Sequence, residues 1–535
     1  MSRPSHSPAP ARVLWQFAIF AAIFELAVFV TFALLESAGI ALVAVVVSIP
    51  LAMRFADTLD VRLGQLLAST PDDLEAPLPR SELRACVAYP LIDRPDSAPA
   101  DFFTSIVDNI KSNPHPLVQH VVVFDLVDSN TELDQADIDR LVAIEAAFES
   151  HCRTEDPNAA LLVRARKWSV GEGRWIGPER KRGKLDQLIA ELADGRSHGE
   201  YLLRSGTIEP AAVIVTVDDG ARLHPGAVAE MADFLLHPSN KPVVVDGVVE
   251  AGFGAVQPGM TQNARQLAKP KADGRFARYG VGTFVGQGAF NVDAYVQTLR
   301  HSIPSASVLS HDKLEGYHLR AARYPRVLIL DAPSPGPRGV AVRNERWVRG
   351  DIQLLPWAVG STSRSRTRLP PLFRWWLWKD IIKTFEPLSS VLLMVIVVTT
   401  PTAFAVQVAA AAVAMISYRS EVLLLLLRPR SGGIRSTIAS AAVKWSEALL
   451  RAAENIGALV TATVRMATKR RLLEWRPSVV TARVPIRILF AQAFALVAAV
   501  TLSVAEFGRG NVVGGIAFAW WACVALAGGI RTTSR

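Results

Sequence analysis

The sequence predicts an α/β domain built on a doubly wound, mostly parallel sheet and joined to an α-helical transmembrane region. Long apolar runs with almost no charge lie at both ends of the 535-residue chain, and a charged, mixed stretch lies between them. Within that middle stretch, short β-rich runs alternate with helical runs. The alternation is typical of doubly wound α/β sheets, whereas long uncharged runs are typical of membrane spans.

The middle stretch forms one predicted domain, at residues 54–371. Ligands of doubly wound sheets bind where the strands end, so the residues that follow each strand are the first candidates for a site. Predicted strands cover residues 85–89, 117–124, 160–168, 211–217 and 243–249. Predicted helices cover residues 134–150, 185–192 and 225–236, the last with a proline in its first turn.

Six apolar segments predict transmembrane helices, in a hairpin at residues 13–53 and in pairs at 388–418 and 488–530. The first run is long enough to cross a hydrocarbon core of about 30 Å. A secretory signal peptide is the alternative, but the run is long, no small-residue cleavage site follows, and a second apolar run comes directly after it. The single spans are residues 13–35, 37–53, 388–400, 402–418, 488–504 and 512–530, and residues 422–427 are too few to cross.

Lysine and arginine flank the predicted spans on one side only, which sets the expected orientation. They gather before residue 13, after residue 53 and in a predicted helical loop at residues 419–487, whereas the connections within the span pairs carry almost none. By the positive-inside rule, the middle domain, this loop and the tails at residues 1–12 and 531–535 are cytosolic. The net charge of +9 therefore reflects topology and not nucleic-acid binding, which would need a basic soluble face.

Tryptophans gather in residues 372–387, just before the third predicted span. Trp375, Trp376 and Trp378 lie beside arginine and lysine there. Tryptophan favours the headgroup level, so the segment predicts an amphipathic helix along the membrane surface, with lipid as a partner. The alternative is a tryptophan-rich helix packed in a protein core.

Acidic residues follow two of the predicted strands. Asp125 ends one strand, with Asp128 nearby, and Asp218 and Asp219 follow another. Carboxylates at such ends can hold a divalent cation, Mg²⁺ or Mn²⁺, which would neutralise a diphosphate leaving group. Ordinary loop and cap aspartates are the alternative.

A basic, glycine-containing turn lies between these two strand ends. Residues 179–184 open a helical run, and this suits phosphate binding through Arg182, Lys184 and free N–H groups, with a solvated basic face as the alternative. The glycine turn at residues 286–290 lacks the G-x-G-x-x-G form, which argues against a dinucleotide fold. Asp312 precedes a helical stretch, where it either takes a proton from a sugar hydroxyl or caps the helix.

The order of these features resembles a known family. An acidic strand end, a basic loop, a second acidic strand end, a glycine turn, Ser-His-Asp and Arg-x-x-Arg-Trp follow one another, as in processive family-2-type glycosyltransferases such as cellulose synthase. In particular, the chain resembles the glycosyltransferase region of cyclic β-1,2-glucan synthases. The resemblance implies a GT-A-type domain at the cytosolic face of a cell inner membrane, in an inverting enzyme that transfers glucose from UDP-glucose to a growing β-glucan, β-1,2-linked or otherwise. The similar segments are residues 171–188, 309–321, 343–357 and 468–475, within residues 83–475.

The resemblance also implies roles in binding the donor. Asp125 is expected near the uracil and ribose, and Lys184 with its basic neighbours is expected to face the diphosphate. Asp218 is expected to be the first carboxylate of a metal-binding D-x-D motif, with Asp219 beside it. The other substrate-binding candidates are Asp128, Arg182, Gly286, Gly288 and Arg343.

For the transfer step, the resemblance implies Asp312 as the general base, Arg346 at the diphosphate and Trp347 at the acceptor sugar. The chain departs from the pattern at Gly220, which replaces the second D-x-D carboxylate, as in the Asp-Ser-Gly of ceramide glucosyltransferases. The cyclic synthases are also far longer and carry a carbohydrate-active region for chain-length control. The alternatives are therefore a non-catalytic membrane partner or sensor, or a single-transfer glycolipid glucosyltransferase. Expected partners are UDP-glucose, a glucan acceptor and other proteins of glucan synthesis or export.

Overall fold

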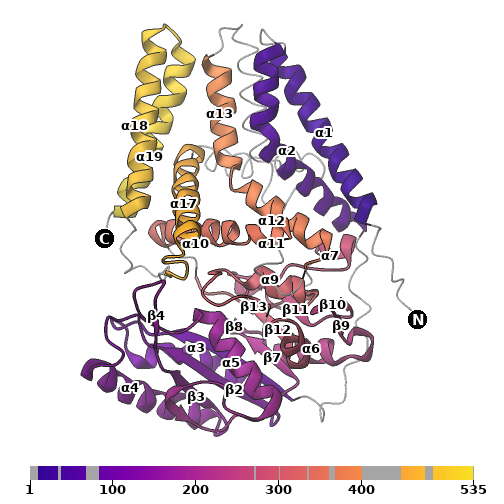
Figure 1. The fold of residues 1–535 in the computed structure, drawn as a ribbon, viewed down its shortest axis with the longest axis vertical. Helices are drawn as coiled ribbons and strands as arrows, with labels where there is room; N and C mark the ends of the chain where they lie inside the picture. Colours follow the sequence, from indigo (N-terminus) through magenta and orange to yellow (C-terminus); the bar gives the residue numbers. More distant parts are fainter. Residues whose placement is uncertain are drawn as a thin grey trace.

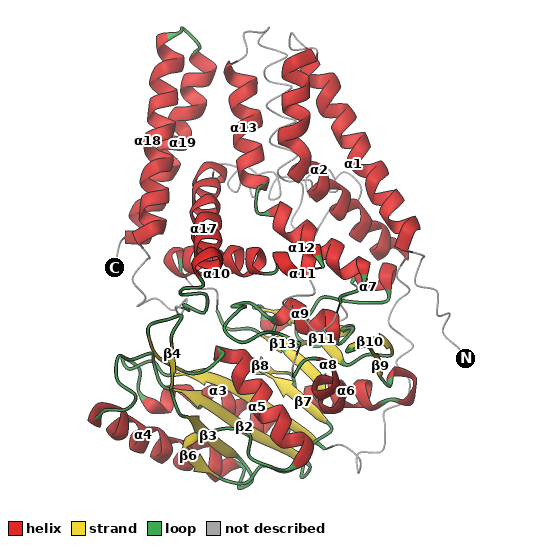
Figure 2. Ribbon diagram, viewed as in Figure 1, coloured by secondary structure: helices red, strands yellow, loops and turns green. Residues whose placement is uncertain are grey.

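The computed structural model describes residues 10–33, 38–67, 84–269, 273–300, 302–333, 336–360, 368–399, 447–475 and 486–533. Figure 1 shows a sheet domain at one end of the molecule, a group of long helices at the other, and shorter helices between the two. Figure 2 shows that strands occur in the sheet domain and that the other end is helical. The described residues therefore contain an α/β part, as predicted, and a separate helical part.

The main sheet has nine strands in the order β6-β3-β2-β1-β7-β12-β11-β13-β8. The neighbours β3, β2, β1 and β7 run parallel, as does the pair β11 and β13. The strand β12 runs antiparallel to both of its neighbours, and the edge strands β6 and β8 are antiparallel as well. The α/β prediction thus holds, while parallel pairing is confined to these two groups. The bounds are β1 (Ala85–Ile92), β2 (Val118–Asp125), β3 (Ala160–Arg164), β6 (Tyr201–Ser205), β7 (Val213–Thr216), β8 (Arg222–Leu223), β11 (Ala255–Thr261), β12 (Gly288–Asn291) and β13 (Ala322–Leu330).

Helices cover both faces of this sheet, which explains why its central strands are apolar throughout. Along β1, Cys86 and Ala88 pack toward one face, and Ala85, Val87 and Tyr89 pack toward the other. A strand buried on both sides has no polar face and reads as a continuous apolar run. One face carries α3 (Thr104–Ser112), α4 (Gln135–Phe148) and α6 (Ala227–Leu236), and the other carries α5 (Arg180–Asp194), α8 (Val292–Thr298) and α9 (Asp312–His318).

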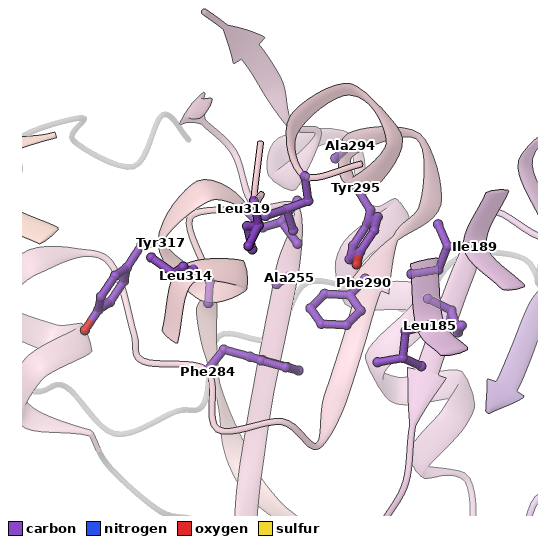
Figure 3. Packing of buried hydrophobic residues seen from close by; sticks show 14 of the residues in the cluster. Leu185, Ile189, Ala255, Phe284, Phe290, Ala294, Tyr295, Leu314, Tyr317 and Leu319 are labelled. Atoms are coloured by element: carbon purple, nitrogen blue, oxygen red, sulfur yellow. The ribbon is translucent and has the colours of Figure 1, made fainter. Parts of the chain in front are cut away.

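The α9 helix is held by apolar contacts on two sides. Leu314, Leu319 and Phe284 belong to one buried cluster, and Figure 3 shows Tyr317 pointing away from Leu314 and Leu319. The Tyr317 ring stacks on Phe373 of α12 (Pro371–Lys383), with ring centres 4.8 Å apart. Asp312, the first residue of α9, is therefore fixed by the packing of its own helix.

Several predicted elements have different bounds in the structure. Residues 160–168 form β3 and then a separate strand β4 (Lys167–Ser169), which pairs with β5 (Arg174–Ile176). Residues 243–249 form a hairpin of β9 (Val243–Val245) and β10 (Val248–Ala251), because Asp246 and Gly247 have positive φ and close a tight turn. The helical stretch that follows His311 is short: α9 ends at His318, and Arg320, with a φ of +50°, turns the chain toward β13, which begins at Ala322.

The long helices correspond to five of the predicted spans. Among the described residues, one helical stretch, Gly39–Gly64, is long and apolar enough to cross a membrane. Four shorter apolar stretches occur at Phe17–Val30, Glu386–Ile396, Ala495–Gly508 and Gly514–Val524. The predicted segments 402–418 and 422–427 lie outside the described residues, so six spans stay a prediction. The helices that correspond to predicted spans are α1 (Pro10–Ala33), α2 (Ala38–Leu67), α13 (Glu386–Thr399), α18 (Ile486–Gly508) and α19 (Val512–Thr533), whereas α17 (Ala448–Thr468) lies in the predicted basic loop.

The tryptophan-rich segment forms α12 and packs on the sheet domain. Trp376 is buried, with its ring 5.3 Å from that of Tyr279 and 5.9 Å from that of Tyr317. This packing matches the core alternative for Trp376, and a position of α12 along a membrane surface stays a prediction.

Candidate active site

Four charged side chains from separate elements converge beside the end of β7. The Nζ of Lys181, in the first turn of α5, lies 2.5 Å from Oδ1 of Asp218 and 2.6 Å from the carbonyl oxygen of Gly286. A Cβ placed on Gly286 would lie 2.8 Å from Oδ1 of Asp312, so that carboxylate borders the same glycine. Gly286 also has a φ of +94°, which together with this close approach requires glycine. Asp218, Asp312 and Lys181 thus surround one small region.

Arg346 joins this group from α10 (Pro337–Gln353). Burial lowers the pKa of its guanidinium, and the carboxylates of Asp218 and Asp312 act in the opposite direction, as expected for charges that face one another. The centre of the Trp475 ring lies 5.6 Å from the guanidinium carbon of Arg346. The structure therefore brings together three of the residues predicted for catalysis or metal binding: Asp218, Asp312 and Arg346.

His311 and Glu315 support Asp312 from inside the domain. Both are buried, and Nδ1 of His311 lies 2.8 Å from Oε1 of Glu315 and 3.8 Å from Oδ1 of Asp312. Burial alone would lower the pKa of His311, but the nearby carboxylates of Glu315 and Asp312 outweigh it and raise the pKa. Among the described residues, this trio is the one group of three potential metal ligands whose ligand atoms lie within 4.8 Å of one another.

The residues around Asp218 do not match a D-x-D cation site. Oδ1 of Asp218 is paired with Lys181, and Oδ2 of Asp219 lies 2.5 Å from Nη1 of Arg94. The third position is Gly220, with a φ of +76° and no ligand atom. A hard divalent cation needs several oxygen ligands directed at one point, and here each carboxylate faces a separate cation of the chain. Burial raises the pKa of Asp219, and the charge of Arg94 opposes the rise.

Asp125 and Lys184 form a buried ion pair below this region. Arg164 donates to both Asp125 oxygens, over 2.7 and 2.8 Å, and Nζ of Lys184 lies 3.0 Å from Oδ2 and 2.5 Å from the Leu91 carbonyl oxygen. Burial would raise the pKa of Asp125, but Arg164 and Lys184 outweigh it and lower the pKa. Because Arg164 already neutralises the carboxylate, burial prevails at Lys184 and lowers its pKa to about 8. Contacts of this pair with uracil or diphosphate stay predictions.

The first turn of α5 has a strained backbone that other side chains hold in place. Glu179 and Arg180 both have a φ of +56°, a conformation that costs roughly 1–3 kcal/mol for a residue other than glycine. Arg180 pairs with Asp128, and Glu179 pairs with Arg182 and accepts a hydrogen bond from the Ala306 N–H over 2.7 Å. Asp128 and Arg182 thus support this turn, and their contacts with substrate stay predictions.

The segment at residues 469–475 closes over this turn from a distant part of the chain. Arg180 donates to the carbonyl oxygen of Leu473 over 3.1 Å, and Arg349 of α10 donates to that of Glu474 over 2.6 Å. The N–H of Arg471 donates to the Gly171 carbonyl oxygen over 2.9 Å. These contacts explain how Trp475 reaches Arg346. The sequence identifies residues 468–475 as one of the segments similar to glucan synthases, but it predicts no role for Trp475.

The remaining predicted residues are Arg343, Trp347 and Gly288. Trp347 is 53% exposed, and the guanidinium carbon of Arg343 lies 5.0 Å from the centre of its ring. Gly288 lies within β12, where a Cβ would come within 2.3 Å of the Val256 carbonyl oxygen, so its glycine is required by sheet packing. Trp347 therefore presents an open aromatic face, while Gly288 supports the sheet.

Comparison with known proteins is consistent with the motif order. No family model matches the chain. The chain is 29% identical over 327 residues to the cyclic β-(1,2)-glucan synthase NdvB of Rhizobium meliloti (strain 1021). The aligned part is 55% of this chain and 11% of the synthase, so the chain spans about a tenth of that relative's length. The resemblance to cyclic β-1,2-glucan synthases that the sequence predicts is confirmed by this similarity.

Proposed function

We propose that this protein is an inverting glycosyltransferase that transfers glucose from UDP-glucose to a growing β-glucan. The observation that carries the proposal is the convergence of Asp218, Asp312 and Arg346 from three separate elements on one region beside Gly286. The similarity to a glucan synthase supports a sugar donor and a glucan acceptor as the substrate classes. The α/β sheet, with its candidate site at the strand ends, is in keeping with a GT-A-type domain.

The transfer is a single displacement at the anomeric carbon. Asp312 takes the proton from an acceptor hydroxyl, and the hydroxyl oxygen forms a bond to C1 of glucose. The bond between C1 and the diphosphate oxygen breaks, and UDP leaves with that electron pair. In this proposal Arg346, on which the carboxylates of Asp218 and Asp312 also act, stabilises the charge that grows on the diphosphate, and the exposed Trp347 offers its ring to the C–H face of the acceptor sugar. No step of this transfer uses Mg²⁺ or Mn²⁺, because Asp218 and Asp219 are each paired with a cation of the chain.

The helical part suits a multi-pass anchor in a cell inner membrane, with the sheet domain in the cytosol. The support is the apolar stretch Gly39–Gly64, the four shorter apolar helices and the gathering of lysine and arginine on one side of the predicted spans. In the proposed arrangement, the nucleotide sugar binds from the cytosol and the polymer leaves through or along the membrane.

The decisive experiment measures UDP release by the purified full-length chain in lipid nanodiscs. We expect UDP to appear with UDP-glucose but not with UDP-galactose, and we expect no GDP from GDP-mannose. We expect linkage analysis to find a β-glucan. Binding of UDP-glucose without release in the presence of acceptor would replace this proposal with the non-catalytic partner or sensor. A product with one glucose on a lipid, identified by mass spectrometry, would replace it with the glycolipid transferase.

A further inference from the structure

We propose that the ammonium of Lys181, and not a divalent cation, is the catalytic group that meets the leaving diphosphate beside Asp218. The inference rests on the proposed function and extends it to the charge chemistry of the leaving group. It follows from a conflict between the sequence, which suggests a metal site at Asp218 and Asp219, and the side chains that occupy that place.

The contacts of Lys181 put its charge where the metal was expected. Its Nζ lies 2.5 Å from the Asp218 carboxylate and 2.6 Å from the Gly286 carbonyl oxygen, so two of its three protons are used. The side chains of Lys181 and Asp218 are 23% and 46% exposed, so a ligand can approach both. The third proton of the ammonium is then available to a phosphate oxygen.

The neighbouring carboxylates cannot easily turn to serve a metal instead. Asp219 lies against Arg94, whose guanidinium carbon also lies 4.5 Å from the centre of the buried Phe102 ring. Gly220 brings no oxygen ligand from a side chain. A dication at Asp218 would therefore have one carboxylate of the predicted D-x-D motif, and it would lie a few ångström from a like charge on Lys181.

The protein also keeps Lys181 charged and fixed. Burial alone would lower its pKa, but the carboxylates of Asp218 and Asp312 outweigh burial and raise the pKa. The strained backbone at Glu179 and Arg180 directly precedes Lys181, and strain of this kind persists where the surrounding structure enforces it. Arg346 is a second cation on which the charges of Asp218 and Asp312 act, and fixed cations of this kind stabilise developing phosphate charge.

The first test compares UDP release by the wild-type protein after dialysis against EDTA, with and without added Mg²⁺ or Mn²⁺. We expect the rates to agree within about twofold, and we expect calorimetry to give the same Kd for UDP in EDTA and in Mg²⁺. A loss of more than about tenfold in EDTA that Mg²⁺ or Mn²⁺ restores would overturn the inference. Failure of the proposed function would look different, because UDP release would then be absent under every one of these conditions.

The second test replaces Lys181, with Lys111 as the matched control. We expect Lys181→Met to lower kcat by about 10²–10³-fold, the usual loss when one fixed group that stabilises transition-state charge is removed. Lys181→Arg keeps the charge and should recover at least tenfold of that loss. Lys111→Met, on a side chain that is 57% exposed on α3, should leave kcat unchanged. A Lys181→Met variant with wild-type kcat would overturn the inference even if EDTA does not change the rate of UDP release by the wild type.

Discussion

Replacing Asp312 by asparagine tests the proposed base most directly. The variant keeps the size of the side chain beside Gly286 and removes its ability to accept a proton. A positioned general base contributes about 10²–10⁴ in rate, so kcat should fall by about 10³, or about 4 kcal/mol of activation free energy. Asp312 is 29% exposed in the first turn of α9, where a negative charge stabilises a helix by about 0.3–1 kcal/mol. The expected loss of stability is therefore far smaller than the loss of activity.

The assay is steady-state UDP release by the full-length protein in nanodiscs, together with thermal unfolding of the same sample. KM for UDP-glucose should change by less than about threefold, because Asp312 is proposed to act on the acceptor. Asp134→Asn is the matched control: Asp134 caps α4 through the Asp137 N–H, and asparagine caps a helix equally well. A kcat for Asp312→Asn within threefold of wild type would reject Asp312 as the base.

Three further substitutions test the contacts around the site. Trp475→Ala removes the ring that faces Arg346 and should lower kcat/KM about tenfold, whereas Trp475→Phe should recover most of the loss. Equal values of kcat/KM for the wild type and both variants would rule out a role for this contact. Lys313→Met leaves Asp351 and Asp380 without the ammonium that lies 2.6 and 2.9 Å away, and thermal unfolding should report a loss of about 2 kcal/mol that Lys313→Arg reduces. The pKa of Lys184 is lowered to about 8, so the folded protein releases this proton at a lower pH than the unfolded chain does. As pH rises from 8 to 10, the free energy of unfolding of the wild type should therefore increase by up to about 2 kcal/mol relative to Lys184→Met. A difference in melting temperature that stays constant over that range would contradict the buried pair.

The sequence predicted the acidic strand ends because parallel strands impose a simple geometry. The strands β1, β2 and β7 run in the same direction, so Asp125 and Asp218 come to the same edge of the sheet. The motif order added Asp312 and Arg346, which no local pattern could have brought to that edge. The antiparallel strand β12 was missed because it is short and begins with a glycine, and its partner β7 lies about 70 residues earlier in the chain.

The different contacts of Lys181 and Lys184 could not be predicted from the sequence pattern. Both lie in one basic run, and a spacing of three places them on the same side of a helix. Their contacts differ because of the residue at which α5 begins. The left-handed backbone at Glu179 and Arg180 determines where α5 begins. A glutamate or an arginine in a sequence does not predict a left-handed backbone. Lys184 consequently lies against Asp125, and Lys181 reaches Asp218.

From hydropathy, the second span was predicted to end at residue 53, but the helix α2 continues to Leu67. Hydropathy predicts the length of an apolar segment and not the end of the helix that contains it. The added turns carry Asp57, which pairs with Arg275 of α7 (Gly274–Tyr279) over 3.2 Å and with Lys383 of α12 over 2.8 Å. Lys383 also reaches Asp380, which pairs with Lys313, the residue directly after Asp312. An unbroken series of ion pairs thus joins the apolar helix α2 to the helix that begins with the proposed base. Displacing α2 would leave several partly buried charges without partners, so the position of α2 and the candidate site depend on the same interactions.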